Sequence, residues 1–315
     1  MIRSADLRAE LSAAVLMVEP AHFAFNDETA RDNSYMHPPG VDARAAAMAE
    51  FERATAVLAD IGVEVIRLPG SADPMPDAVF PNNWLGTDND GLVIVFPMKH
   101  PSRQRETAQL DAALLAFEAA AFQVEGVLRL DEPSRDAALE GTGSLVLDRR
   151  SSTIYAALSP RTDAGRVRSF ARLRGFERVE LFRATGREGE SLYHTNVMMG
   201  LGRGFAVICP ESIEDPADRS RVLRRLREDR DVIEVGRDTM NEAFACNVIG
   251  VGDRNGQQVV VMSRSAHEGF TAKDRDRLSA HGRLAVLDMP TIERIGGGSA
   301  RCLVAEVFLP RVGRG

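Results

Sequence analysis

Short apolar segments alternate along the chain with longer segments whose apolar residues are three and four positions apart. The first set has an apolar strand at Val15–Val18, a helix rich in Ala and Glu over residues 42–61, and an alternating strand over residues 63–68. Spacing of three and four is typical of an amphipathic helix, and alternation is typical of a half-buried strand. Gly62, between the helix and the second strand, suits a C-terminal helix cap.

The same order of elements recurs four more times, each time after an opening segment that carries a polar residue. The predicted strand, helix and strand lie at residues 92–96, 105–121 and 124–130; at 153–158, 163–173 and 178–182; at 204–209, 216–227 and 232–235; and at 259–263, 272–279 and 284–287. Each opening segment adds a further strand. The pattern therefore predicts an α/β protein built from five strand–strand–helix–strand units.

The polar residues of the opening segments are Asn83, Glu140, His194, Asn247 and Cys302, which are 53 to 57 residues apart. A constant period of this length indicates an internal repeat. The first unit lacks an opening strand and the last apolar segment lacks a helix, so we expect the C-terminal strand to complete the N-terminal unit. A closed ring of five units would bring an acid, a histidine and a cysteine to one end of the central axis.

The segment from Ile295 to Pro310 places three glycines before Cys302 and an apolar stretch after it. Glycines permit positive φ and close approach of a ligand or another chain. A short apolar stretch between Gly and Pro predicts a buried strand. Cys302 is thus either a buried structural cysteine or a nucleophile whose base lies elsewhere in the chain. We expect the other two cysteines, Cys209 and Cys246, to be inert.

Composition narrows the classes of function. The chain has 315 residues, 44% of them hydrophobic and 27% charged, and a net charge of −7. No basic face favours nucleic acid, no apolar stretch is long enough for a membrane span, and three distant cysteines argue against disulfides and zinc. No signal peptide is expected, and a cytoplasmic location fits. We expect one catalytic domain over residues 1–315, with a long polar segment at 26–40 as a candidate lid.

Several short motifs, in this order and spacing, resemble those of the pentein superfamily of guanidine-modifying enzymes, which includes arginine deiminases, dimethylarginine dimethylaminohydrolases and amidinotransferases. The motifs are Pro76–Phe80, Pro101–Arg103, Leu139–Gly143, Leu158–Thr162 and Gly297–Cys302. The resemblance implies a five-bladed α/β propeller. It is strongest to a bacterial branch of citrulline-utilisation hydrolases and amidinotransferase-like proteins.

The resemblance also implies roles for individual residues. Cys302 would attack a planar carbon that carries nitrogens, because the thiolate is the reactive form of cysteine. His194 would protonate the leaving nitrogen and then activate water, and Glu140 would hold a substrate nitrogen and orient His194. Asp77 would hold a second substrate nitrogen, although it could also simply cap a turn.

Two arginines are candidates for binding the α-carboxylate of a substrate. A guanidinium fork matches a carboxylate, and Arg103 and Arg161 lie in motifs that resemble the family's arginine segments. Each has a structural alternative, since Arg103 could pair with Glu106 on a helix surface and Arg161 could be a charge at a helix start.

Two amides depart from the deiminase pattern, in which aspartates are common. Asn83 and Asn196 are neutral and offer both a donor and an acceptor, which suits a ureido group better than a guanidinium. We therefore expect citrulline or a related ureido acid to be cleaved to the amine, ammonia and carbon dioxide. An arginine or dimethylarginine hydrolase and an amidinotransferase stay open as alternatives.

A non-catalytic ribosome-associated factor is disfavoured by the Cys, His and Glu set. The enzyme is expected to need no cofactor and no metal, to bind a small-molecule substrate without nucleic acid or membrane, and to be compatible with homo-oligomer formation.

Overall fold

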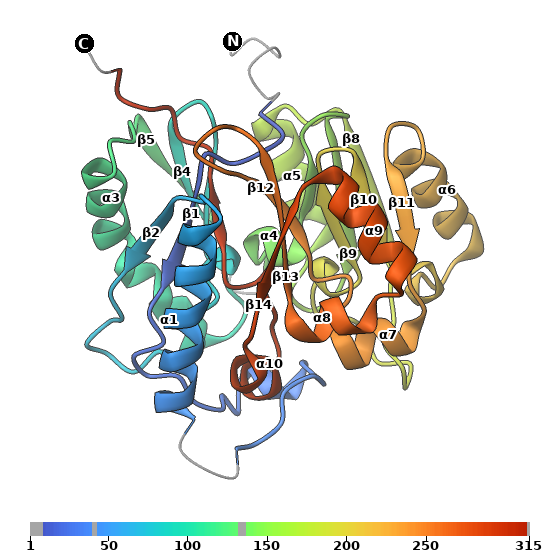
Figure 1. Ribbon diagram of the computed structural model, residues 1–315, viewed down its shortest axis with the longest axis horizontal. Coiled ribbons are helices and arrows are strands. Elements are labelled where there is room, and N and C mark those ends of the chain that lie inside the picture. Colours follow the sequence, from blue (N-terminus) through green and yellow to red (C-terminus); the bar gives the residue numbers. More distant parts are fainter. Residues whose placement is uncertain (1–8, 40–42, 132–136, 314–315) are drawn as a thin grey trace.

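The computed structural model describes residues 9–39, 43–131 and 137–313, and these form a mixed α/β fold (Figure 1). In the described residues the strands make three sheets of three strands and one sheet of six. The three-stranded sheets have the orders β15 (Ala305–Val307), β1 (Ala14–Val18), β2 (Val65–Leu68); β3 (Leu85–Thr87), β4 (Leu92–Val95), β5 (Gly126–Arg129); and β6 (Val146–Asp148), β7 (Thr153–Leu158), β8 (Arg178–Arg183). The six-stranded sheet has the order β11 (Asp231–Glu234), β10 (Phe205–Ile208), β9 (Met199–Gly202), β12 (Ile249–Gly252), β13 (Gln258–Ser263), β14 (Arg283–Leu287).

One pairing rule repeats through these sheets. In each set of three, the first strand is antiparallel to the middle strand and the third is parallel to it. The six-stranded sheet contains two such sets, which are joined by one parallel pair between Ile249 of β12 and Leu201 of β9. The C-terminal strand β15 pairs with β1, with Ala14 opposite Val307, so the expectation that it completes the N-terminal unit is confirmed.

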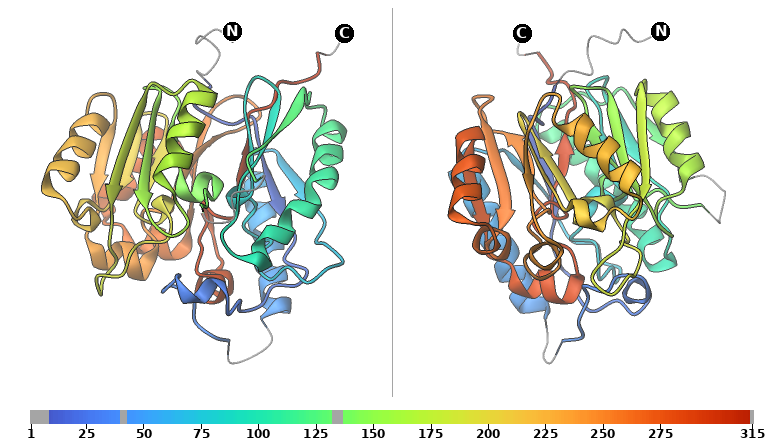
Figure 2. Two further views of the ribbon diagram at one scale, coloured as in Figure 1. Left: turned by 180° about the vertical axis from the view of Figure 1, so that it is seen from behind. Right: turned by 90° about the vertical axis from the view of Figure 1, so that its right-hand side faces the viewer.

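The longer helices lie around the outside of the strands, while the short helix α4 lies near the middle of the molecule (Figures 1 and 2). The α-helices are α1 (Arg44–Asp60), α2 (Pro101–Gln104), α3 (Leu110–Ala119), α4 (Gly141–Ser144), α5 (Ala164–Arg174), α6 (Pro216–Leu226), α7 (Arg237–Ala243), α8 (Arg264–Gly269), α9 (Ala272–His281) and α10 (Pro290–Gly296). Short 3₁₀ turns lie at η2 (Thr29–Arg31), η3 (Pro81–Asn83), η4 (Arg105–Gln109), η5 (Thr195–Val197) and η6 (Pro210–Ser212).

Most of the predicted elements are present, with differences at their ends. The strand predicted at residues 153–158 is β7, and Gly62 has a φ of +95° just after α1. The helix predicted over residues 105–121 is divided into η4 and α3, because ψ is close to 0° at Gln109. The first residue of the helix predicted at 42–61, and Gly40 at the end of the candidate lid, lie outside the described residues.

The end of the chain differs most from expectation. The segment before the three glycines is a helix, α10, and the predicted strand after Cys302 is reduced to β15. A short helix was missed here because seven residues give too little periodicity to recognise. Cys302 therefore lies in the turn between α10 and β15.

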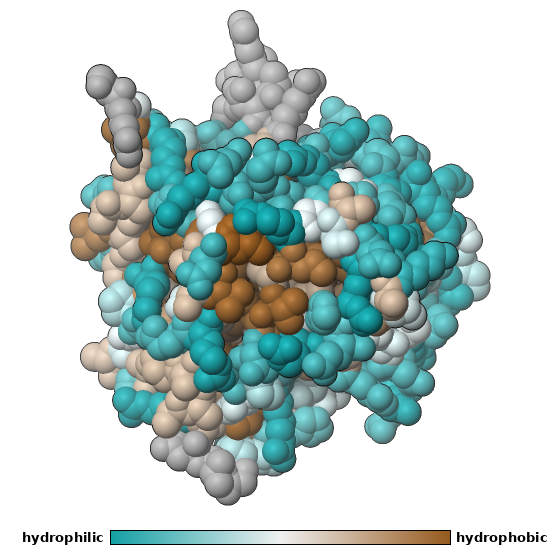
Figure 3. All heavy atoms as spheres, in the orientation of Figure 1, coloured by the Kyte–Doolittle hydropathy of each residue, from teal (hydrophilic) through white to brown (hydrophobic). Residues whose placement is uncertain are grey.

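The apolar core is divided into four clusters between the sheets and their helices. In Figure 3, apolar side chains also gather at the middle of one face, over β13 and β14, with polar side chains around them. Among the described residues, no helix has the length and apolar character that crossing a bilayer requires.

Candidate active site

Cys302 lines a small cavity, about 290 Å³ in volume, together with five of the other predicted site residues. The opening segments of different units and the end of α10 meet here, as the repeat predicts. The residues that line the cavity are Thr29, Asn33, Asp77, Phe80, Asn83, Arg103, Arg161, Tyr193, His194, Gly296, Gly297, Gly298 and Cys302. The other two predicted residues do not line the cavity but contact residues that do: Glu140 contacts His194, and Asn196 contacts the sulfur of Cys302.

The three glycines fix the course of the chain into Cys302. Gly297 ends α10 with a φ of +63°, a conformation that L side chains rarely adopt. A Cβ atom at Gly298 would lie 2.9 Å from the ring of Phe80. The hydroxyl of Tyr193 donates to the carbonyl of Gly297 at 2.5 Å. The turn is therefore held by contacts on several sides, and glycine is required for its close packing.

The thiol of Cys302 is buried, with 4% of the residue exposed. Burial raises the pKa of this thiol, while a hydrogen bond from Asn247 lowers it. The amide nitrogens of Asn247 and Asn196 lie 3.3 and 3.5 Å from Sγ. The neutral thiol is thus favoured, and two donors face the sulfur.

His194 and Glu140 form a buried pair. Nε2 of His194 lies 2.8 Å from Oε2 of Glu140, whose Oε1 accepts the backbone N–H of Lys99 at 3.0 Å. Burial acts to raise the pKa of Glu140, but Arg161 and His194 hold it well below its ordinary value. Burial lowers the pKa of His194, although the hydrogen bond to Glu140 opposes this. An ionised Glu140 therefore selects the tautomer with the proton on Nε2 and leaves Nδ1 with a lone pair.

Asp77 has one oxygen satisfied and one not. Its Oδ2 accepts from Nδ2 of Asn26 at 2.8 Å and from the hydroxyl of Thr29 at 3.0 Å. Its Oδ1 is buried and has no partner within the described residues. Buried polar groups normally have partners, so this oxygen is a candidate acceptor for a ligand.

Arg103 is paired with Glu106, but not on a helix surface. Both side chains are buried, and the guanidinium contacts Glu106 at 2.8 and 2.9 Å. The same group donates to Oδ1 of Asn83 at 2.6 Å and to the carbonyl of Phe80 at 3.1 Å. Arg103 is thus largely engaged by the protein, and Asn83 keeps only its Nδ2, which has no partner among the described residues.

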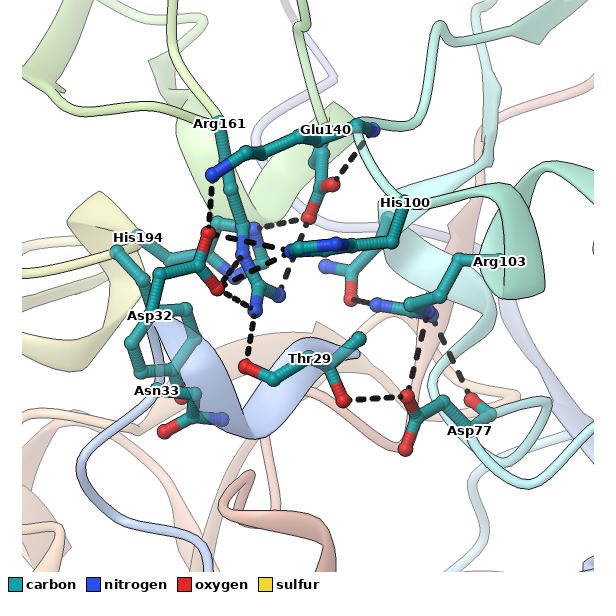
Figure 4. Close-up of polar contacts among 12 residues, drawn as sticks. Thr29, Asp32, Asn33, Asp77, His100, Arg103, Glu140, Arg161 and His194 are labelled. Carbon is teal, nitrogen blue, oxygen red and sulfur yellow. Dashed lines mark hydrogen bonds and ion pairs between the residues drawn. The ribbon is translucent and has the colours of Figure 1, made fainter. Parts of the chain in front are cut away.

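Arg161 meets the 26–39 segment, which covers the cavity. Its Nε lies 3.0 Å from Oδ1 of Asp32, its Nη2 contacts the same oxygen, and its Nη1 lies 3.5 Å from Oε2 of Glu140. Figure 4 shows Asp32 beside the guanidinium of Arg161, and Thr29 beside Asp77. Asp32 also contacts Lys99 at 2.5 Å and His100 at 3.2 Å. One carboxylate therefore joins the covering segment to three basic side chains.

Sequence reasoning missed the residues of this segment. Asn26, Thr29, Asp32 and Asn33 lie in a stretch that was predicted only as a candidate lid, because no pattern in it indicates which side chains face the cavity. Asn247 was noted for its place in the repeat and was given no role. In the described part of the chain, no three His, Cys, Asp or Glu side chains come together as metal ligands would.

Replacing Asp32 with asparagine is expected to lower the free energy of unfolding by about 1–3 kcal/mol, because it leaves basic groups partly unpaired. Burial acts to raise the pKa of Asp32, but His100 and Arg161 hold it well below its ordinary value. A lowered folded-state pKa gives stability that is present above the pKa of the unfolded carboxyl and is lost as the pH falls below it. Urea unfolding at pH 7 and at pH 3 measures this, and an equal loss at both pH values would contradict it.

Comparison with known proteins gives the family. Residues 19–309 match the family model described as N,N dimethylarginine dimethylhydrolase, eukaryotic. No curated protein sequence matches the chain significantly.

Solved structures share the fold at low sequence identity. ArgZ, an arginine dihydrolase from the ornithine-ammonia cycle in cyanobacteria, is 19% identical with a TM-score of 0.71; the match covers 95% of this chain and 41% of ArgZ. Its substrate-bound N-terminal domain is 20% identical with a TM-score of 0.71, and the match covers 94% of this chain and 99% of that domain. A dimethylarginine dimethylaminohydrolase adduct with S-methyl-L-thiocitrulline is 17% identical with a TM-score of 0.66, covering 94% of this chain and all of that one. The dimethylarginine dimethylaminohydrolase and arginine dihydrolase homologues are hydrolases that act on carbon–nitrogen bonds. The chain belongs to the N,N dimethylarginine dimethylhydrolase family within the pentein superfamily.

Proposed function

We propose that the protein hydrolyses a guanidino amino acid of the arginine type through an intermediate covalently bound to Cys302. The observation that carries this proposal is the buried, unpartnered Oδ1 of Asp77, which lines the same cavity as Cys302. A guanidinium N–H would satisfy this oxygen, and the charge-assisted bond would be stronger than a neutral one. ArgZ, which shares the fold, is an arginine dihydrolase.

The charges around the cavity support a cationic ligand. Four carboxyl groups lie in or behind its wall, and three basic side chains and His100 pair closely with them. Burial raises the pKa of one of the four, Glu106, to about 7. The carboxylates are Asp32, Asp77, Glu106 and Glu140, and the basic side chains are Lys99, Arg103 and Arg161. Asp77 has the weakest pairing, with Nε of Arg103 at 4.0 Å from Oδ2. A bound guanidinium would supply a positively charged donor to the oxygen of Asp77 that has no partner in the described residues.

The reaction that we propose gives a role to each of the three predicted catalytic residues, of which Cys302 and His194 line one cavity and Glu140 contacts His194. Nδ1 of His194 takes the proton of the Cys302 thiol, and the thiolate attacks the central carbon of the guanidinium. The tetrahedral adduct collapses when His194 returns that proton to the leaving nitrogen, so that an amine or ammonia departs and a thiouronium stays on sulfur. His194 then takes a proton from water, hydroxide attacks the same carbon, and the carbon–sulfur bond breaks. The protonated ureido product passes its extra proton to the released amine or to water, and the thiolate takes back the proton held by His194 as the neutral product leaves.

The α-carboxylate of the substrate would bind Arg161. Because Asp32 occupies this guanidinium in the closed arrangement, a substrate carboxylate would replace part of that contact. Arg103, held by Glu106, would keep Asn83 in place and contribute positive charge at the far wall.

The proposal is tested by incubating the purified protein with arginine, methylated arginines, agmatine and citrulline, and measuring ammonia, methylamines and the ureido product. Arginine or a methylated arginine is expected to be the best substrate, and agmatine, which lacks the carboxylate, a poor one. Turnover of citrulline alone would reject the guanidino assignment and favour the ureido alternative.

The ureido alternative, citrulline hydrolysis to ornithine, ammonia and carbon dioxide, is favoured by one observation. Nδ2 of Asn83 is a buried donor without a partner in the described residues, and it would suit a ureido carbonyl. Replacing Asn83 with aspartate keeps the acceptor for Arg103 and removes this donor. If the donor serves a ureido group, the ratio of citrulline to arginine turnover is expected to fall about tenfold or more. An unchanged ratio in kcat/KM measurements would contradict a ureido contact at Asn83.

The proposal also covers the arrangement of the strand sets, the extent of the domain and the conditions under which the enzyme works. The five sets of three strands would act as blades around a central axis, in one catalytic domain over residues 1–315. The enzyme would work in the cytoplasm on a small-molecule substrate without a cofactor, and transfer of the amidino group to an amine instead of water would need an acceptor site. Homo-oligomer formation stays a prediction that sedimentation would test.

A further inference from the structure

Asn247 contacts two other segments of the site, the turn that holds Cys302 and the turn that holds Asn196. The residue is buried, with 1% exposed, and lies just before β12. Its Oδ1 accepts the backbone N–H of Arg301 at 2.9 Å. Its Nδ2 donates to the backbone carbonyl of Asn196 at 3.0 Å and lies 3.3 Å from Sγ of Cys302.

The main-chain partners settle which end of the amide faces the sulfur. Turning the amide over would put Oδ1 against the carbonyl of Asn196 and Nδ2 against the N–H of Arg301. Both contacts would then join like partners, acceptor to acceptor and donor to donor. Nδ2 is therefore the amide atom nearest Sγ, at 3.3 Å, and Oδ1 lies 3.7 Å from Sγ, where it can accept from the neutral thiol. This orientation does not depend on any assumption about the cysteine.

We propose that Asn247 is a positioning residue that fixes the turn before Cys302 and stabilises the thiolate form of its side chain. The inference rests on the proposed role of Cys302 as nucleophile. A donor that faces a group able to carry negative charge favours the charged form. The carbonyl end orients the backbone at Arg301, and the amide end acts on the sulfur itself.

Other groups also affect the ionisation of the Cys302 thiol, and the effect of Asn247 has to be distinguished from theirs. Burial opposes ionisation of the thiol, and the amide of Asn196, at 3.5 Å, is a second donor. The charged and titratable side chains that face Cys302 across the cavity are Asp77, Arg103, Arg161, Tyr193 and His194, and Arg301 is its neighbour in the chain. Of the two amides, Asn247 lies closer to Sγ, and it also accepts a main-chain N–H of the turn before Cys302, that of Arg301.

The test compares Asn247→Asp and Asn247→Ala with the unaltered protein. Aspartate keeps an acceptor for the N–H of Arg301 but places a carboxylate oxygen, not a donor, against the sulfur. The ultraviolet absorbance of the thiolate is titrated with pH and corrected with Cys302→Ala, and the rate of alkylation of Cys302 by iodoacetamide is followed across the same pH range. The midpoint, the pH at which half of the Cys302 thiol is ionised, is expected to rise by about one pH unit or more in the aspartate variant, and by less in the alanine variant.

A matched control is available in Gln258, another buried amide that is bonded to the main chain at both ends. It accepts from the N–H of Arg203 and donates to the carbonyls of Arg203 and His281, with no contact to Cys302. Gln258→Ala is expected to leave the thiol midpoint unchanged. If aspartate prevents folding, as judged by circular dichroism, the alanine variant alone decides.

An unchanged midpoint in a folded alanine variant would overturn the inference and leave Asn247 a purely structural residue. The titration needs no substrate, so it can be read even if the guanidino assignment fails. Conversely, turnover of arginine with an unshifted thiol midpoint would reject the role of Asn247 and leave the proposed function intact.

Discussion

Replacing Cys302 with alanine is expected to lower kcat on the best guanidino substrate by at least about 10⁴-fold, because loss of a nucleophile removes the whole covalent route. The fold should persist, since the change removes one small buried side chain and costs about 1 kcal/mol. Ammonia or amine release measured with excess enzyme checks the rate, and thermal unfolding checks the fold.

Cys209 provides the matched control. It is also buried, but it lies in the core beside Ser212 and Met240, away from the cavity. Cys209→Ala is expected to lose a similar amount of stability and to keep its kcat. Turnover by Cys302→Ala at more than about one-hundredth of the original rate would exclude a covalent sulfur intermediate.

Replacing Glu140 with glutamine is expected to lower kcat/KM by about 10²- to 10⁴-fold, the range typical of a lost acid–base function. The neutral amide can accept from His194 through its oxygen, but it no longer favours the protonated imidazole that the leaving nitrogen needs. It also removes negative charge next to Arg161, which lies 3.5 Å from Oε2.

The pH dependence separates this effect from a general loss of stability. Glu140 acts to raise the pKa of His194 against the effect of burial. Removing its charge therefore lowers the pKa of His194 further, and the histidine limb of the kcat/KM profile should move to lower pH. If the variant keeps a measurable rate and the histidine limb of its kcat/KM profile stays at the same pH, then Glu140 does not control the pKa of His194.

Asp148 is a suitable comparison for Glu140. It is also buried and accepts from both Nη atoms of Arg230 at 2.6 and 2.7 Å, but unlike Glu140 it has no hydrogen bond to His194 or to another residue that lines the cavity in the described part of the chain. Asp148→Asn should lower the free energy of unfolding and leave kcat and its pH profile unchanged.

The repeat made much of the fold predictable from the sequence. Strands such as β7 and helices such as α6 carry strong periodic patterns, and the spacing of Glu140, His194 and Cys302 indicated that distant segments would meet. The short helix α10 carries no such pattern, so the glycines before Cys302 were taken for a flexible turn, although they end a helix.

The parts of the site that were not predicted depend on contacts between segments. Asp32 lies in a polar stretch without periodicity, and only its position opposite Arg161 gives it a role. The orientation of the Asn247 amide depends on two backbone groups in other units. Likewise, Arg103 could be paired with Glu106 from their spacing, but the burial of the pair could not be read from it.

The antiparallel pairing of β1 with β15 also has a consequence for how the protein folds. Its partners, Ala14 and Val307, are almost the whole chain apart, so this contact closes a very long loop and is entropically expensive to form early. During synthesis on the ribosome, Cys302, the proposed nucleophile, emerges after every other residue that lines the cavity. The sheet that contains β15 can form only after that. A nascent chain would therefore hold no reactive cysteine, and activity during refolding should appear in a single late step together with the closure of this sheet.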